Sequence, residues 1–163
     1  KPYAGWEKGQ AVTKQYADFF KPAIYNNCGG PRMAGFVSQW CATIFHDAKP
    51  ADLMPLYYKI MNYEKEVPHD RLAVTGLSAD YVFRETKRVI AGVNSEIPVY
   101  PGIDIDIPTR EGQKRTTPDD VREAVKAAFT AGAEGVVLSR RYSEMRLANL
   151  AGAGQGLREA GVV

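Results

Sequence analysis

The sequence predicts an α/β fold in which parallel strands alternate with helices, and three observations lead to this prediction. Apolar residues recur at helical spacing in several segments, and short β-branched runs follow those segments. No strand-like run is joined to the next by a two-residue hairpin turn, so neighbouring strands are expected to run parallel. At 163 residues, with 45% hydrophobic and 25% charged residues, the chain has the size and composition of one globular domain.

The clearest predicted element is a helix that begins after Thr117. Threonine is a favoured N-cap, proline a favoured first helical residue and an acid a favoured third, and Thr117, Pro118 and Asp120 follow that order. Apolar residues then recur at helical spacing as far as Gly132, which is expected to end the helix.

The same order of helix and strand is expected along the rest of the chain. Serine residues provide N-caps for two more helices, at Ser78 and Ser143. The predicted strands are residues 21–25, 97–107 and 135–138. The predicted helices are residues 11–19, 32–45, 51–63, 78–92, 117–132 and 143–160.

Three strands are too few for a closed eight-stranded barrel, which takes ~250 residues. The chain is therefore either a compact open sheet or part of a barrel whose other strands lie elsewhere. The segment 131–138 resembles the tight helix-to-strand joint of (β/α)8 barrels, which favours a partial, half TIM-barrel-like domain over residues 1–163. Such a half barrel exposes strand edges and apolar surface, and we expect it to form a homodimer or to pair with the remainder of a longer barrel.

Two carboxylates in the strand 97–107 are the first candidate site. Alternation along a strand places Asp104 and Asp106 on one face, with α-carbons ~7 Å apart. Carboxylates at the carboxyl end of a parallel strand lie where barrel active sites are built, and their repulsion raises the pKa of one of them. This arrangement predicts catalytic work on a glycosidic bond. The alternative is structural: the acids cap the next loop or pair with Arg140.

A second candidate site follows the first predicted strand, in the segment 25–32, with Tyr25, Asn26, Asn27 and Arg32. These side chains can donate and accept hydrogen bonds with sugar hydroxyls, and the glycines that follow allow close approach of a ligand to the backbone. We therefore predict that they bind substrate. The alternatives are a phosphate held at the N-terminus of the following helix and an Asn/Gly-rich turn without a ligand.

The last predicted strand ends in a third polar segment. Arg140 is expected to orient a carboxylate or bind an anion, and Tyr142 and Glu144 are further candidates for substrate contact. An acid in the first turn of a helix is also the usual partner of the helix dipole, so Glu144 has a structural alternative.

Two resemblances bear on these segments. Residues 102–106 (GIDID) resemble part of the D-x-x-D-x-D-x-E strand of family 18 chitinases, with Asp104 and Asp106 matching its second and third acids. Pro108 stands where that family has its proton-donating glutamate, so the chitinase mechanism is not carried over. From about residue 20 to 160 the chain resembles the C-terminal part of a bacterial glycoside-hydrolase-like (β/α)8 barrel, in the stretches KPAIYNN, TGLSADYV, YPGIDIDIP and AGAEGVVLSRRYSEMRLANLAGAG.

The second resemblance implies a carbohydrate-active protein that hydrolyses glycosidic bonds through carboxylates. If residues 97–107 are its seventh strand, Asp104 or Asp106 occupies the place of the nucleophile, and the partner acid lies outside this chain. The alternative function is a noncatalytic α/β module that binds a ligand or takes part in assembly.

The remaining features narrow the function further. The net charge of +2 gives no reason to expect nucleic-acid binding, and no run of ~18 apolar residues predicts a membrane span. His46 and His69 have no metal-ligand spacing, and we expect neither a metal nor a cofactor. The aromatic group at residues 57–63 is typical of helix packing, with a rim for sugar stacking as the alternative. The sequence does not determine a compartment, and a secreted or periplasmic location is compatible with it.

Overall fold

The structure is a computed structural model that describes residues 4–163, with the backbone alone for residues 4, 6 and 7. Residues 1–3 of the predicted domain lie outside the described residues. The helices are α1 (Ala4–Thr13), α2 (Asn26–Ala42), α3 (Pro50–Met61), α4 (His69–Thr75), α5 (Ala79–Gly92), α6 (Pro118–Thr130) and α7 (Leu147–Glu159). The strands are β1 (Gly102–Asp104) and β2 (Val137–Ser139), and the short 3-10 helices are η1 (Lys14–Tyr16) and η2 (Tyr142–Glu144).

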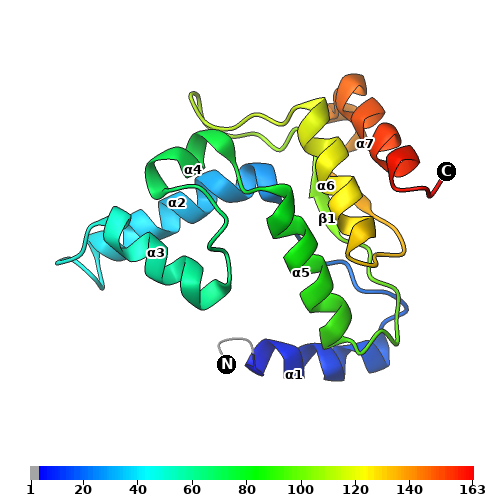
Figure 1. Cartoon of the computed structure of the whole chain (residues 1–163), viewed down its shortest axis with the longest axis horizontal. Helices are drawn as coiled ribbons and strands as arrows, with labels where there is room; N and C mark the ends of the chain where they lie inside the picture. The colour runs from blue at the N-terminus through cyan, green and yellow to red at the C-terminus, as the bar shows by residue number, and fades with distance from the viewer. Residues whose placement is uncertain (1–3) are drawn as a thin grey trace.

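The helices fall into two groups that α5 connects. In Figure 1, α2, α3 and α4 lie together on one side of α5, while α6 and α7 lie on the other. The first group has its own apolar core, built around Met54, Tyr58 and Leu72. Helices α2 and α4 approach closely because Gly30 has no side chain: a Cβ there would lie 2.5 Å from the Leu72 carbonyl oxygen.

A small parallel sheet packs against α5 and α6. β1 pairs with β2 in parallel, with Asp104 opposite Ser139. The segment 20–24 adds to the other side of β1 through two parallel bridges, Phe20 to Val99 and Ala23 to Gly102. All three predicted strand segments therefore take part in one parallel sheet, in chain order, and the prediction of an α/β fold is confirmed. Helices predominate and the strands are short, so the described residues establish a parallel α/β arrangement and leave the half TIM-barrel-like arrangement a prediction.

One face of this sheet is covered by helices and carries the core. Ile24 and Ile103 pack against α5 and α6, and Ile105 packs against α6 and α7. Alternation turns the neighbouring residues to the opposite face, where Lys21 and Ala23 are exposed. We call this opposite side the open face of the sheet.

Two predicted helices begin where the sequence indicates. The Ser78 hydroxyl accepts a hydrogen bond from the Tyr81 backbone nitrogen at the start of α5. Thr117 and Asp120 form a complete capping box at the start of α6, in which each side chain accepts from the other's backbone nitrogen.

Other predicted boundaries are wrong, and each error has a local cause. The strand 97–107 reduces to β1, because Pro98 and Pro101 have no N–H to donate and Asp106 turns into a left-handed conformation with φ +54°. The helix expected from Ser143 begins instead at Leu147, after η2. In the N-terminal half, α1 occupies residues 4–13 rather than 11–19, α2 begins at Asn26 rather than near 32, and α4 was not predicted.

Candidate functional site

Three polar side chains meet on the open face of the sheet. The Lys21 ammonium donates to the Tyr25 hydroxyl at 2.9 Å, and that hydroxyl donates to Ser139 Oγ at 3.1 Å. The residues come from two segments that both border β1, and Gly102 between them leaves room: a Cβ there would lie 2.8 Å from the Lys21 Cε. Tyr25 is predicted from the sequence, but Lys21 and Ser139 are not, since only the parallel pairing places the three residues together.

The tyrosine in this cluster is electrostatically perturbed. Burial raises the pKa of the Tyr25 phenol, but the hydrogen bonds with Lys21 and Ser139 and the Lys21 charge lower it by more. The pKa of Tyr25 therefore lies below its ordinary value. The phenol is consequently a better hydrogen-bond donor than an ordinary tyrosine.

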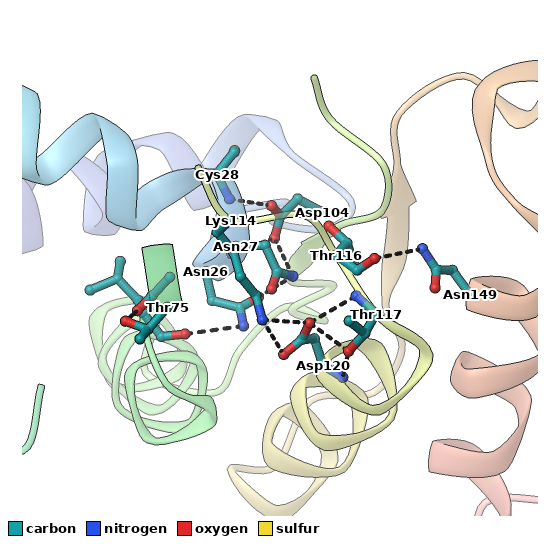
Figure 2. Close-up of polar contacts among 12 residues, drawn as sticks. Asn26, Asn27, Cys28, Thr75, Asp104, Lys114, Thr116, Thr117, Asp120 and Asn149 are labelled. Carbon is teal, nitrogen blue, oxygen red and sulfur yellow. Dashed lines mark hydrogen bonds and ion pairs between the residues drawn. The ribbon is translucent and has the colours of Figure 1, made fainter. Parts of the chain in front are cut away.

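Asp104 is fully buried and holds the start of α2. Its Oδ1 accepts from the Asn27 backbone nitrogen at 3.1 Å, and its Oδ2 accepts from the Cys28 backbone nitrogen at 2.7 Å. The N-cap residue of α2, Tyr25, makes no side-chain capping bond, so Asp104 satisfies N–H groups that the local sequence leaves open. Figure 2 shows the carboxylate directed at this helix end.

Asp106 binds a different helix. Its carboxylate accepts from the Arg146 backbone nitrogen and Nε, both at 2.8 Å, and from Asn149 Nδ2 at 3.0 Å. These donors stand at the N-terminus of α7. The expected structural alternative, in which the acids pair with Arg140, is wrong for Asp106, which pairs with Arg146.

Asp104 and Asp106 do not alternate along one strand, as the prediction of a catalytic pair assumes. The strand alternation does not extend to Asp106, because β1 ends at Asp104 and Asp106 has a left-handed backbone. Asp104 already accepts hydrogen bonds from the N-terminus of α2, and Asp106 accepts them from the N-terminus of α7. The catalytic roles of Asp104 and Asp106 stay a prediction.

Asn26 and Asn27 are enclosed by protein. Their exposed fractions are 3% and 2%. Asn26 Nδ2 donates to the Leu77 carbonyl oxygen at 3.4 Å, and the Asn26 carbonyl oxygen accepts from the Leu77 backbone nitrogen at 2.8 Å. Asn27 Nδ2 donates to Asp104 Oδ1 at 3.4 Å (Figure 2). Both amides therefore tie α2 to its neighbours, and the described surroundings leave them little contact with a ligand.

The third predicted segment lies on the surface after β2. Arg140 Nε pairs with Glu144 Oε2 at 2.7 Å, and both side chains are exposed. Tyr142 is 88% exposed. None of these three residues lines the cavity described next. Their predicted contact with substrate stays a prediction.

A cavity of about 560 Å³ opens beside Tyr25, between α2, α3 and α5. We call it the Tyr25 cavity. Its aromatic lining consists of Tyr25, Phe36, Trp40, Tyr57 and Tyr81. The aromatic group at 57–63 is divided in the structure: Tyr57 lines the cavity, whereas Tyr58 and Tyr63 are buried in the core.

Polar groups of the Tyr25 cavity are available to a ligand. The hydroxyls of Tyr57 and Tyr81 make no hydrogen bond to any other residue that the structure describes. Burial raises the pKa of both phenols, so both stay protonated and can donate. Arg32 also lines the cavity, and within residues 4–163 its exposed guanidinium has neither an ion pair nor a hydrogen bond.

The two cysteines do not form a disulfide. Cys28 and Cys41 are both free and buried, and they lie 13 residues apart on α2, about 20 Å along the helix axis, too far for a disulfide.

In the described part of the chain, no three His, Cys, Asp or Glu side chains are grouped to hold a metal ion. No helix within residues 4–163 has the length and apolar character needed to cross a membrane.

Comparison of the chain with protein-family models, curated proteins and solved structures finds no match.

Proposed function

We propose that this protein binds a saccharide in the Tyr25 cavity. The observation that carries the proposal is the lining: five aromatic side chains surround a space of about 560 Å³, with two tyrosine hydroxyls that have no other described partner. Small-molecule sites are typically about 300–1,000 Å³, with mostly apolar and aromatic walls and a few convergent polar groups. The cavity has that size and that lining.

Sugar rings suit such a lining because they are amphipathic. The C–H faces of a pyranose pack against aromatic rings, while its hydroxyls both donate and accept hydrogen bonds. Trp40 and Tyr57 meet edge to face, with ring centroids 5.5 Å apart, so the wall presents two differently oriented aromatic surfaces. The Tyr57 and Tyr81 hydroxyls supply hydrogen bonds to the ring substituents.

Hydrolysis of a glycosidic bond is the second candidate function. Its support is the resemblance to glycoside hydrolases together with the position of Asp104 and Asp106 at the end of β1. Asp106 is the more accessible of the two, with a side chain 13% exposed beside a cavity of about 330 Å³ that it lines together with Arg146. Binding takes precedence over hydrolysis in this proposal because both carboxylates already hold helix N-termini.

The half barrel and the homodimer belong to the same proposal. Three parallel segments in chain order, with helices on one face, are what a portion of a (β/α)8 barrel contains. The open face, with Lys21 and Ala23 exposed, is the side that a barrel would enclose. We propose that a second copy of the chain covers it. Light scattering that gives the mass of one 18.0 kDa chain at all concentrations would contradict the dimer.

Tryptophan fluorescence tests the binding proposal directly. The chain has two tryptophans, so in a Trp6→Phe background Trp40 alone reports on the cavity. Titration with a panel of neutral, amino and acidic oligosaccharides is expected to change the Trp40 emission saturably for at least one of them. Chromatography of the incubated sugars shows whether any is cleaved, which separates hydrolysis from binding.

Matched variants locate the site. Tyr57→Phe and Tyr81→Phe each remove one hydroxyl, and each is expected to weaken binding about 2- to 10-fold, the value of one neutral hydrogen bond. Tyr16→Phe removes an exposed hydroxyl outside the cavity and is expected to leave binding unchanged. No saturable change with any sugar, or equal weakening by Tyr16→Phe, contradicts saccharide binding in the Tyr25 cavity.

A further inference from the structure

We propose that the saccharide in the Tyr25 cavity carries a carboxylate, as in a uronic acid, and that Arg32 binds it. This inference rests on the proposed function, since it names the class of sugar that the same cavity takes. It comes from the charge of the lining, which the aromatic residues alone do not reveal.

Among the described residues that line the Tyr25 cavity, Arg32 alone is charged, and none is Asp or Glu. Arg32 stands on α2, as do Met33, Phe36 and Trp40 of the same wall. Other arginines have an opposite charge within reach, for example Arg84 with Asp80 and Arg140 with Glu144. The Arg32 guanidinium has no such partner in residues 4–163, so a ligand can supply it.

Three carboxylates act on the Tyr81 phenol through their charge, and each already has other partners. Glu85 acts on the Tyr57 and Tyr81 phenols through its charge, but it already pairs with Arg88 and accepts from the Tyr63 hydroxyl. Glu66 accepts from the Ser78 backbone nitrogen and hydroxyl, and Asp104 accepts from the N-terminus of α2. None of these three carboxylates has a described ion pair with Arg32 or lines the Tyr25 cavity, so Arg32 supplies the charge of the lining.

A second cation lies beside the cavity. Lys21 donates to the Tyr25 hydroxyl at 2.9 Å, and its ammonium lies 5.0 Å from the centroid of that ring. It makes no ion pair with any described acid. The charge of Lys21 therefore adds to that of Arg32 on the Tyr25 side of the cavity.

A carboxylate fits this arrangement better than a hydroxyl does. Guanidinium binds carboxylate through two parallel N–H···O bonds, which are about twice as strong as neutral hydrogen bonds. The aromatic walls and tyrosine hydroxyls hold the sugar ring, as already proposed, and the fork of Arg32 selects the acidic substituent.

The test compares acidic sugars with their own methyl esters. Oligomers of glucuronic, galacturonic and mannuronic acid are titrated against the full chain, each alongside its methyl-esterified form, which has nearly the same shape and no charge. At least one acid is expected to bind 10-fold or more tightly than its ester. Raising the salt concentration from 50 to 500 mM is expected to weaken binding of the acid and to leave the ester unchanged.

Two variants assign the effect to Arg32. Arg32→Gln is expected to reduce acid binding to the level of the ester and to leave ester binding unchanged, and Arg32→Lys is expected to restore part of the preference. Arg110→Gln removes an exposed arginine that does not line the cavity, and it is the matched control.

The outcomes separate this inference from the proposed function. If acids and esters bind equally well, or if only neutral sugars of the panel bind, saccharide binding stands and the carboxylate inference is wrong. If Arg110→Gln weakens acid binding as much as Arg32→Gln does, the preference is a general charge effect and Arg32 is not the carboxylate site. If no sugar of either kind binds, the proposed function itself is wrong.

Discussion

Helices α6 and α2 begin in contrasting ways. Helix α6 is capped by its own first residues: the Thr117 hydroxyl accepts from the Asp120 backbone nitrogen, and the Asp120 carboxylate accepts from the Thr117 nitrogen at 2.8 Å. Helix α2 has no capping side chain of its own, and the carboxylate of Asp104, more than 70 residues away in the chain, takes that role. The cap of a helix can therefore lie within its own first four residues, or it can come from a distant residue that only the folded chain brings close.

Asp120 and Asp104, the acids at these two helix starts, also differ in their burial and in the groups that bind them. Asp120 at the start of α6 is half-buried and pairs with Lys114 Nζ at 2.8 Å, so water and a cation share its charge (Figure 2). Asp104 is fully buried, and the described donors to it are N–H groups of α2. A buried carboxylate depends on such bonds, because it would otherwise be costly to place in the protein interior.

The largest expected effect is on the distant cap. Asp104→Ala removes two charge-assisted hydrogen bonds, each worth about 1.5–3 kcal/mol, and is expected to lower the free energy of unfolding by about 3 kcal/mol or more. Urea denaturation measures the change. Asp104→Asn keeps one acceptor oxygen and is expected to fall between wild type and Asp104→Ala, which preserves the test if the alanine variant does not fold.

Asp119→Ala is the matched control for that comparison. Asp119 stands in the first turn of α6, but its side chain is 80% exposed, and its loss is expected to cost less than about 0.5 kcal/mol. If Asp104→Ala costs no more than Asp119→Ala, the buried carboxylate does not stabilise the start of α2.

A smaller effect is expected at Asp106, the distant acid at the start of α7. Asp106→Asn removes the charge that Arg146 meets but preserves a residue type that tolerates the left-handed backbone, and we expect a loss of about 2 kcal/mol. Asp106→Ala is expected to cost a further ~1 kcal/mol, because alanine is strained at φ +54°. Equal stability of the two variants in urea would contradict the contribution of the backbone conformation.

The local cap is expected to matter less than either distant one. Thr117→Ala removes the acceptor for the Asp120 nitrogen and is expected to cost about 1 kcal/mol, whereas Thr117→Ser should recover most of it. Thermal or urea unfolding of the three proteins measures the order. A loss for Thr117→Ala as large as that for Asp104→Ala would remove the distinction between local and distant caps.

The same distinction explains what the sequence could predict. The starts of α5 and α6 are visible because Ser78 and Thr117 cap within their own turns. The segment 137–139 is visible because it overlaps the contiguous apolar run 135–138, and 102–104 is visible because it lies in a run rich in β-branched residues. The start of α2 at Asn26 could not be found, because its cap is on β1, and the run Asn-Asn-Cys-Gly-Gly-Pro has the composition of a turn.

The candidate site divides in the same way. Tyr25 was found because it follows a strand segment, and Tyr57 because it belongs to an aromatic group on one helix. Arg32 belongs to the predicted polar segment 25–32, whereas Trp40 is an ordinary residue in the sequence; the cavity between α2, α3 and α5 brings both into one lining. Asp104 and Asp106 were noticed for their spacing, but their partners on α2 and α7 are set by tertiary contacts.

The last prediction concerns Cys28, the third residue of α2, whose backbone nitrogen donates to the buried Asp104 carboxylate. Burial and the neighbouring charge of Asp104 raise the pKa of the Cys28 thiol from 9.0 to about 12. The folded thiol therefore keeps its proton over a pH range in which the unfolded thiol loses it. The resulting contribution to stability is complete below pH 9 and is lost as the pH rises from about 9 toward 12.

Near neutral pH this contribution does not change with pH, so the expected effect there is the smallest of the series. Above pH 9, the advantage in unfolding free energy of the native chain over Cys28→Ala is expected to shrink. In Cys41→Ala, where Cys28 is the only cysteine, iodoacetamide at pH 8.5 is expected to react at least ten times more slowly with folded than with urea-unfolded protein, because the thiolate is the nucleophile. Equal rates would mean that Cys28 is open to solvent and that Asp104 does not enclose the start of α2, and the contrast with the exposed, locally capped start of α6 would then be lost.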